Sequence, residues 1–447
     1  MAMNVNVRRA VGIPVFLALL AAGRPAARAV TLDACIDEAL RANPDVRAAA
    51  ERVLAARAAV REARSAYYPV LGGSASYART DNPPQAFFMR LNQRQASLQS
   101  DFNNPPDTDT LALSLGAKYR LYDFGRRGLG VAMARGGAEL ARLALEALRN
   151  DLVHQVTRGY YSALQARAFV AAQEESVATL EESLRITRAR VEAGSAVKSD
   201  ALSLEVQLAQ AREGLVGARN GVRLAVAALN TAIGTNLAEA AGLAACEEPR
   251  DARPPEREDE CVLQDRPELR AARQAAAVAR ADADRARRSA LPVLNAFGSL
   301  DWNAEQASDW ERSYSFGVAA ETDFFDGFRR SAAASGARAR LRAAEAEVEK
   351  TAGALRLDLS SACLRAGEAW ERLEVVRLAI RSAEEALRLT RQRYELGAAD
   401  LAELLNAQAG LTGTRTRHAA ALYDYLIARS DLERARGRLA ARAADTQ

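Results

Sequence analysis

The chain has 447 residues and a formal net charge of only +4, since 61 Lys and Arg face 57 Asp and Glu. The basic residues are interleaved with acidic ones rather than clustered, which argues against a nucleic-acid partner. Aromatic residues (6%) and prolines (13) are few, a composition typical of long helices packed along small residues.

The N-terminus carries an export signal. Arg8 and Arg9 precede an apolar run from Val11 to Ala22, and a small-x-small cleavage site follows at Ala27-Arg28-Ala29. These features predict a signal peptide over residues 1–29 and a mature chain that starts near Val30. The mature sequence has no run of 18 apolar residues, so no transmembrane helix is expected.

The next segments predict a helix followed by two strands. Residues 31–66 show helical spacing of apolar positions, interrupted at Asn43-Pro44. Strands are expected over residues 71–77 and 110–122, and the stretch from Asn82 to Pro106, rich in Asn and Pro, is expected to be a long loop. Residues 294–302 and 313–325 repeat the strand pattern.

These strands alternate between an apolar face and a small or charged face and are roughly 10 residues long. A soluble sheet with one solvated face and a membrane sheet both fit this pattern. Four strands cannot close a barrel alone. The chain therefore forms either a small sheet or one part of a barrel shared by several protomers.

Long helices follow each strand pair. Apolar and alanine positions at alternating steps of three and four predict antiparallel hairpins with helices over residues 128–192 and 198–233, and again over 331–394 and 400–440. The two hairpin tips have similar sequences: Arg188-Ala-Arg190 precedes Gly194, and Arg391-Gln-Arg393 precedes Gly397. Both glycines suit a left-handed position that ends a helix.

The chain is therefore predicted to be an internal duplication. The expected organisation is a first repeat over residues 30–242, a linker over 243–262, a second repeat over 263–440 and a tail over 441–447. Cys246 and Cys261 bracket the linker; in an oxidising compartment a disulfide between them and two separate thiols are both open. Cys35 and Cys363 lie within helices and are expected to be packed.

No catalytic or metal-binding motif is present. His154 and His418 are the only histidines, and each lies within a predicted helix. We expect no enzymatic activity, no metal and no cofactor.

The hairpin tips are the candidate functional site. Asp200 and Glu403 each follow the tip glycine by six residues. If several protomers pack around an axis, these carboxylates form rings that favour cations. Arg190, Arg393 and Lys198 lie close to the same turns and could pair between neighbours to hold the end closed. Ordinary solvated turn residues are the alternative.

The order of these parts resembles the TolC-type outer-membrane channels of efflux and type I secretion systems. The resemblance rests on a signal peptide, a helix with Asn-Pro-Asp or Arg-Pro-Glu, a Pro-led strand pair, a long hairpin with a tip glycine, and then the same unit again. It implies a mainly helical fold with duplicated hairpins in a periplasmic α-barrel, and four strands per protomer in a trimeric outer-membrane β-barrel. It also implies a homotrimer in contact with lipid, a periplasmic adaptor, an inner-membrane pump and passive transport.

The resemblance assigns roles to several tip residues. Glu403 matches the first position of a carboxylate ring at the entrance, whereas the second position is Asn406 here. Asp200 and Tyr394 match members of a closing network. The arginine expected just after the second tip glycine is absent, because Ala399 stands there, and Lys198 or Arg393 is a candidate substitute.

A second class of protein shares the helical hairpins. A periplasmic coiled-coil adaptor or scaffold would need no membrane barrel, and it would lack paired amphipathic strands. The sequence does not indicate which substrate is exported.

Overall fold

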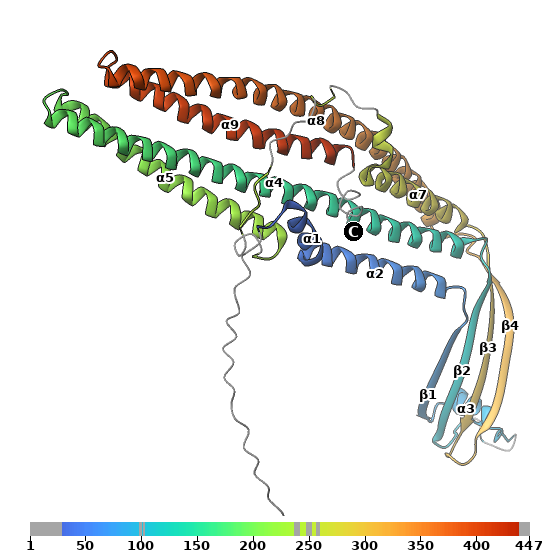
Figure 1. Cartoon of the computed structure of the whole chain (residues 1–447). Coiled ribbons are helices and arrows are strands. Elements are labelled where there is room, and N and C mark those ends of the chain that lie inside the picture. Colours follow the sequence, from blue (N-terminus) through green and yellow to red (C-terminus); the bar gives the residue numbers. More distant parts are fainter. Residues whose placement is uncertain are drawn as a thin grey trace, which may run out of the picture.

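The computed structural model describes residues 29–97, 101, 103–236, 242–246, 253–255 and 260–437. They form long, nearly parallel helices that lead into a four-stranded sheet at one end of the molecule (Figure 1). The predicted signal peptide up to residue 28 and the predicted tail lie outside the described residues. The architecture is mainly helical with two long hairpins, as predicted.

The first repeat begins with two helices separated by a break. Helix α1 (Leu32–Ala42) ends where Asn43 begins helix α2 (Pro44–Ser65). The Asn43 carboxamide oxygen accepts hydrogen bonds from the backbone N–H of Asp45 (2.8 Å) and Val46 (3.4 Å), and Pro44 needs no such acceptor. The predicted interruption is thus an N-cap.

The other elements of the first repeat are the strands and the hairpin: β1 (Val70–Thr80), α3 (Pro83–Asn92), β2 (Thr108–Tyr122), α4 (Arg126–Glu192) and α5 (Lys198–Ile233). The second repeat has a 3₁₀ turn, η1 (Glu260–Asp265), then α7 (Pro267–Arg288), β3 (Val293–Ala304), β4 (Glu311–Glu321), α8 (Arg329–Glu395) and α9 (Leu401–Ala435). Helices α4 and α8 have 67 residues each, so each is about 100 Å long.

Two predictions about the strand region were wrong. The expected loop after β1 contains helix α3, which starts with Pro83 and is capped by Asn82 through a hydrogen bond from Gln85 N–H (3.5 Å). The apolar residue Ala86 in it is fully buried. Strand β4 ends at Glu321 rather than at residue 325, because its last partner, Val293, is the first residue of β3. Phe324 lies beyond it with 97% of its surface exposed.

The sheet joins the two repeats. Its strands lie in the order β1-β2-β3-β4, and all neighbours are antiparallel. The central pair, β2 with β3, brings Leu113 opposite Trp302 and Ser114 opposite Asp301. Strands β1 and β4 each have one neighbour and one open edge.

The two faces of the sheet differ in chemistry. One face, the apolar face, carries Leu71, Leu113, Leu115, Leu300, Trp302, Tyr314, Phe316 and Val318. The opposite side, the polar face, carries Ser74, Ser76, Ser114, Lys118, Arg120, Asn295, Ser299, Asp301, Ser313 and Ser315. On the apolar face Phe316 is 82% exposed, so the side chains there have no cover within one chain. Within the described part of the chain, no helix has the length and hydropathy of a membrane span.

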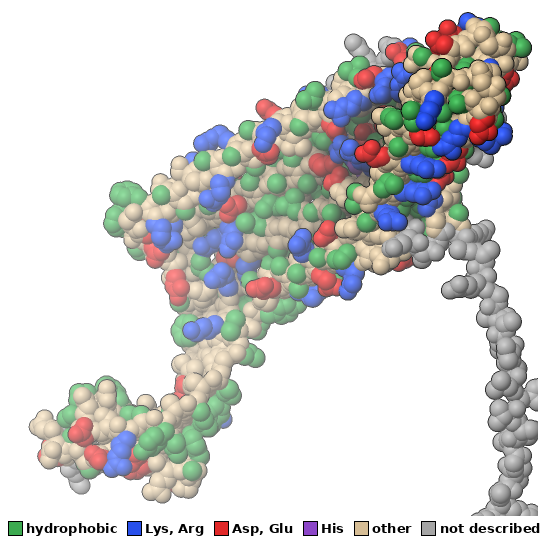
Figure 2. All heavy atoms as spheres, turned by 90° about the vertical axis from the view of Figure 1, so that its left-hand side faces the viewer, with side chains coloured by type: hydrophobic (Ala, Val, Ile, Leu, Met, Phe, Trp, Pro, Cys, Tyr) green, Lys and Arg blue, Asp and Glu red, His purple; other side chains and the backbone are tan. Residues whose placement is uncertain are grey.

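Each long helix packs against two shorter helices. Helix α4 contacts α5 and α2, and α8 contacts α9 and α7; α4 also contacts α7 and α9, which joins the repeats (Figure 1). Three buried clusters result: one around α1, α4 and α5, one around α7, α8 and α9, and one near the tips. Charged side chains of both signs are interleaved over the helices (Figure 2).

In each repeat the residue just before a short helix, α2 or α7, contacts the C-terminal end of the returning hairpin helix, α5 or α9; we call this contact the joint. In the first repeat, Asn43 Nδ2 donates to the carbonyl of Ala232 in the last turn of α5 (3.0 Å). In the second repeat, Arg266 Nη1 donates to the carbonyls of Arg434 (3.1 Å) and Ala435 (2.8 Å) in α9. These groups satisfy carbonyls that a helix end leaves without partners. Asn43 and Arg266 each precede the proline that starts a helix, which marks them as equivalent in the sequence, but the shared contact with a helix end is visible only in the structure.

Two adjacent glycines of α4 provide a matched test of this packing. A Cβ at Gly136 would lie 2.3 Å from Val278 Cγ2 of α7, whereas a Cβ at Gly137 would meet nothing within 4 Å. Since Ala favours a helix over Gly by about 1 kcal/mol, Gly137→Ala should raise the free energy of unfolding by up to that amount. Gly136→Ala should lower it by about 1–3 kcal/mol. Urea unfolding of both variants checks this; equal effects would contradict the close contact.

Candidate functional site

The two hairpin tips have the same backbone structure. Gly194 and Gly397 have φ of +73° and +74°, as expected for a left-handed position that ends a helix. In each tip the residue after the glycine donates to a carbonyl five residues earlier, Ser195 to Arg190 and Ala398 to Arg393, both at 2.8 Å. This is the Schellman arrangement. Both long helices therefore end in the same way.

Tyr394 connects the two tips. The guanidinium of Arg190 lies over the Tyr394 ring, 5.0 Å from its centre, and Arg190 Nη1 donates to the Tyr394 carbonyl at 3.3 Å. The Tyr394 hydroxyl is 3.3 Å from the hydroxyl of Thr187, which is fully buried on α4. Cation–π contact at a partly exposed site contributes roughly 0.5–1 kcal/mol. Arg190 and Tyr394, both predicted tip residues, thus fasten α4 to α8.

Arg393 and Glu403 pair within the second tip. Arg393 Nη1 lies 3.3 Å from Glu403 Oε2, and Arg393 Nη2 donates to the Ala398 carbonyl at 3.1 Å. The Glu403 N–H in turn donates to Asp400, which caps α9 (2.7 Å). About half of each charged side chain is exposed, so the ion pair contributes about 0–1 kcal/mol. It holds the Glu403 carboxylate at the end of the hairpin.

The remaining predicted residues lie at the tips without joining this network. Lys198 and Asn406 are exposed and Asp200 is partly exposed. Among the described residues, Lys198 and Asp200 make no ion pair within 4.0 Å. The single chain therefore brings Arg190 to Tyr394 and Arg393 to Glu403. It does not bring Asp200 to any residue of the second tip.

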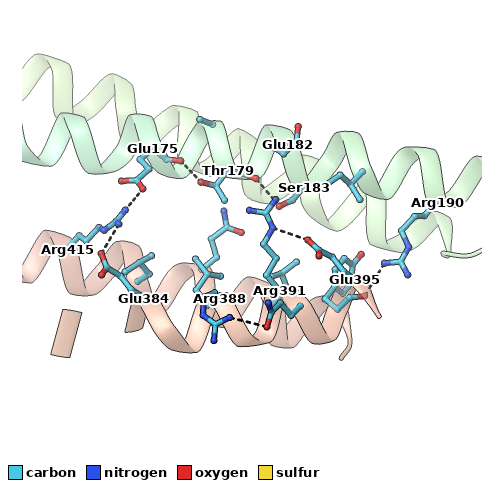
Figure 3. A pocket seen from close by; sticks show the side chains of 18 residues that line it. Glu175, Thr179, Glu182, Ser183, Arg190, Glu384, Arg388, Arg391, Glu395 and Arg415 are labelled. Carbon is cyan, nitrogen blue, oxygen red and sulfur yellow. Dashed lines mark hydrogen bonds and ion pairs between the residues drawn. The ribbon is translucent and has the colours of Figure 1, made fainter. Parts of the chain in front are cut away.

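A groove runs along the two hairpins just behind the tips. It has a volume of about 750 Å³ and is bounded by α4 on one side, α8 on the other and α9 at its base (Figure 3). At the end away from the tip, Arg415 of α9 makes ion pairs with Glu175 of α4 and Glu384 of α8. At the tip end, Arg190 reaches across from α4 (Figure 3). Between these ends the lining is mixed: the apolar side chains of Ile186, Leu387, Leu404 and Leu411 lie among polar and charged ones, which include Thr179, Glu182, Ser183, Arg388 and Arg391 (Figure 3).

Gln408 is a groove residue that sequence reasoning missed. It is only 5% exposed, and neither its carboxamide oxygen nor its nitrogen has a hydrogen-bond partner in the described chain. The equivalent residue in the first repeat is Glu205, which pairs with Arg188 at 2.7 Å. Comparing the two repeats position by position would have singled out Gln408. A buried amide without partners destabilises the chain by about 1–3 kcal/mol unless a ligand or partner satisfies it.

Other predicted residues lie outside the tips. Cys246 packs against the cluster around α1 and α4, and Cys261 is exposed in η1; a disulfide between them stays one of the two alternatives that the sequence leaves open. Burial raises the pKa of the Cys35 thiol to about 11, as expected for a packed cysteine. His154 Nε2 lies 3.1 Å from Asp431 Oδ1 of α9. The described residues contain no metal-ligand cluster.

Comparison with known proteins extends over both repeats. The family described as outer membrane efflux protein matches residues 35–235 and 260–438. CyaE of Bordetella pertussis is 28% identical over 404 residues, or 86% of this chain and 79% of that protein. The alkaline protease secretion protein AprF of Pseudomonas aeruginosa is 25% identical over 351 residues, which are 75% of this chain and 71% of that protein. The CmeC outer membrane channel of Campylobacter jejuni superposes with a TM-score of 0.80 over 97% of this chain and 94% of that one; at 16% identity this establishes the fold.

Proposed function

This chain belongs to the outer membrane efflux protein family, and we propose that three copies of it assemble into one continuous exit duct. As a member of that family it is an outer-membrane channel of an efflux or type I secretion system and extends into the periplasm. It is a transporter and not an enzyme. Family membership also sets aside the alternative of a periplasmic adaptor or scaffold. In the proposed assembly transport is passive, and an inner-membrane pump and a periplasmic adaptor supply energy and opening.

The observation that carries the trimer is the sheet with its two open edges. Strands β1 and β4 each leave a row of backbone N–H and C=O groups unpaired, and in a membrane such groups must find partners. Pairing β4 of one copy with β1 of the next satisfies both edges and closes a barrel of twelve strands. The exposed apolar face then contacts lipid, and the polar face lines the lumen.

Engineered cysteines test this pairing. In one protomer β1 and β4 are three strand spacings apart, roughly 14 Å, which is too far for a disulfide, whose Cα atoms lie within about 7 Å. We expect Ser74→Cys combined with cysteine at Ser313, Ser315 or Ala319 to give covalent trimers for at least one pair after oxidation. Each single-cysteine variant is the control. Absence of covalent oligomers for all three pairs would contradict the shared barrel.

The tips form the entrance of the proposed duct. Glu403, held at the end of its hairpin by Arg393, would line a ring of three carboxylates, with Asp200 of the first tip nearby. Glu403→Gln should lower the K⁺/Cl⁻ permeability ratio in planar bilayers by about twofold, because a carboxylate ring attracts cations. Glu395→Gln, which removes a charge from the groove side of the same tip, is the matched control. An unchanged ratio for Glu403→Gln would mean that no such ring exists.

The groove behind the tips is the proposed docking site of the adaptor. Its apolar side chains, which lie among charged residues of both signs, suit a helix with an apolar stripe flanked by charges, and a polar side chain on that helix would satisfy Gln408. A photo-crosslinking residue at Ile186, inside the groove, should capture the adaptor. The same residue at Leu389, an exposed position of α8 outside the groove lining, should not. Capture from Leu389 alone would place the adaptor elsewhere.

A further inference from the structure

The polar face of the sheet carries its charges at separate levels. Asp301 lies level with Ser114 on β2, Ser74 on β1 and Ser313 on β4. It is the one charged side chain on the described polar face between the level of Lys118 and the level of Glu311. The middle of this face is otherwise lined by serine, glycine and alanine. A single carboxylate thus dominates the electrostatics of this level.

The Asp301 carboxylate is held in place across three strands. Its Oδ1 accepts a hydrogen bond from Ser114 Oγ of β2 (2.5 Å), and its Oδ2 accepts one from Ser299 Oγ of β3 (2.7 Å). The Ser299 hydroxyl is also 3.0 Å from Ser315 Oγ of β4. Hydroxyl donors to both oxygens favour the ionised carboxylate and restrict its orientation. The charge therefore has a defined place on the face.

A layer of opposite sign lies closer to the helices. Lys118 and Arg120 are exposed on the same face, and neither makes an ion pair with any residue that the structure describes. Glu321 lies one level further towards the helices and accepts a hydrogen bond from Asn295; its single negative charge leaves the two cations with a net positive charge. Lys118 is four residues from Ser114 along β2, roughly 13 Å. That distance exceeds the Debye length of about 8 Å at physiological salt, so the two levels act separately there.

We propose that Asp301 is a specificity-determining residue of the channel: its three copies form a cation-preferring ring midway through the membrane barrel. Lys118 and Arg120 form an anion-attracting layer on the periplasmic side of this ring. This inference rests on the proposed trimeric duct. It places a charge filter in the barrel itself, about a whole helix length from the tips and independent of their opening. Solutes that leave the duct would be sorted by charge a second time.

The test removes the carboxylate from β3 and then places a carboxylate on β1 at the same height in the barrel. Purified trimers of Asp301→Asn should show a K⁺/Cl⁻ permeability ratio lower than wild type by about twofold in ~10 mM KCl, where the Debye length is about 30 Å, and no change in 1 M KCl. Adding Ser74→Asp, which places a carboxylate at the same level on β1, should restore the ratio. A role of Asp301 in joining strands alone would not be rescued in this way.

Two further variants keep the test decisive if Asp301→Asn does not assemble. Ser74→Asp in the wild-type background raises the ring from three to six carboxylates and should raise the ratio. Lys118→Gln weakens the positive layer and should also raise it. Open channels with unchanged reversal potentials at low salt in these variants would overturn the inference while leaving the duct intact. If the wild-type protein forms no channel, the proposed duct itself fails.

Discussion

Arg266→Ala is expected to lower the free energy of unfolding by about 3 kcal/mol, one of the two largest effects that we predict. Arg266 is only 3% exposed and holds three elements together. It pairs with Glu268 of α7 (2.8 Å) and Asp358 of α8 (3.4 Å), and it donates to two carbonyls at the end of α9. Removing one partner of a buried ionic network leaves the others uncompensated, which typically costs about 3–5 kcal/mol. The lower end applies here because Glu268 and Asp358 are about one third exposed.

The same arginine makes this effect depend on pH. Burial favours the neutral form of Glu268, but the hydrogen bonds from Arg266 outweigh burial and lower the pKa of Glu268 below its ordinary value of 4.5. A carboxylate with a lowered folded-state pKa stabilises the fold above its unfolded-state pKa, and this contribution is lost as the pH falls through the folded-state pKa. The difference between wild type and Arg266→Ala should therefore be full at pH 7 and shrink below about pH 4.5.

Arg270, in the first turn of α7, supplies the control. It is 40% exposed, and its nearest carboxylate oxygens are 3.7 and 4.0 Å away, so Arg270→Ala should cost less than about 1 kcal/mol. Urea unfolding followed by circular dichroism measures both variants. Equal losses for the two arginines would show that the joint at Arg266 does not stabilise the fold.

Phe316→Arg should prevent assembly in the outer membrane. Phe316 lies at the middle of β4 on the apolar face and is 82% exposed in the single chain. If that face contacts lipid, an arginine near the bilayer centre costs about 2–4 kcal/mol per chain, and a trimer carries three. We expect the amount of trimer extracted from outer membranes to fall at least tenfold.

A neighbouring position on the same strand distinguishes lipid contact from general damage. Ser313 points to the polar face, so Ser313→Arg adds the same side chain to the same strand but on the proposed lumen side. This variant should assemble normally and change only the ion selectivity. Loss of trimer in both variants, or in neither, would contradict the assignment of the two faces.

Much of the fold could be predicted from the sequence because the chain repeats itself. Gly194 and Gly397, read as helix-ending residues, do have positive φ and end helices of the predicted extent. The alternation of apolar with small or charged residues located the four strands. Helix α3 was missed because a run rich in proline and asparagine is typical of loops, although Asn82 and Pro83 also form a good N-cap. The contacts of Arg266 join residues far apart in sequence, which local patterns do not report.

The tip region was predictable as a location but not as a set of contacts. The spacing from the glycines identified Arg190, Arg393 and Glu403 as tip residues, and the family resemblance added Tyr394, but their pairing depends on how the two hairpins pack. Gln408 lies in the apolar stripe of α9, where periodicity predicts a core residue. That it lacks a partner became visible only in the folded chain.

The most direct test of the shared duct is the mass of the native species in the outer membrane. The protein should be extracted in detergent and its mass measured by light scattering on a size-exclusion column, with a heated sample as reference. The account predicts an outer-membrane species of three times the mass of the mature chain that falls to one chain on heating. A monomer or dimer, in the outer membrane or in the periplasm, would contradict the trimer in which β1 and β4 close the barrel.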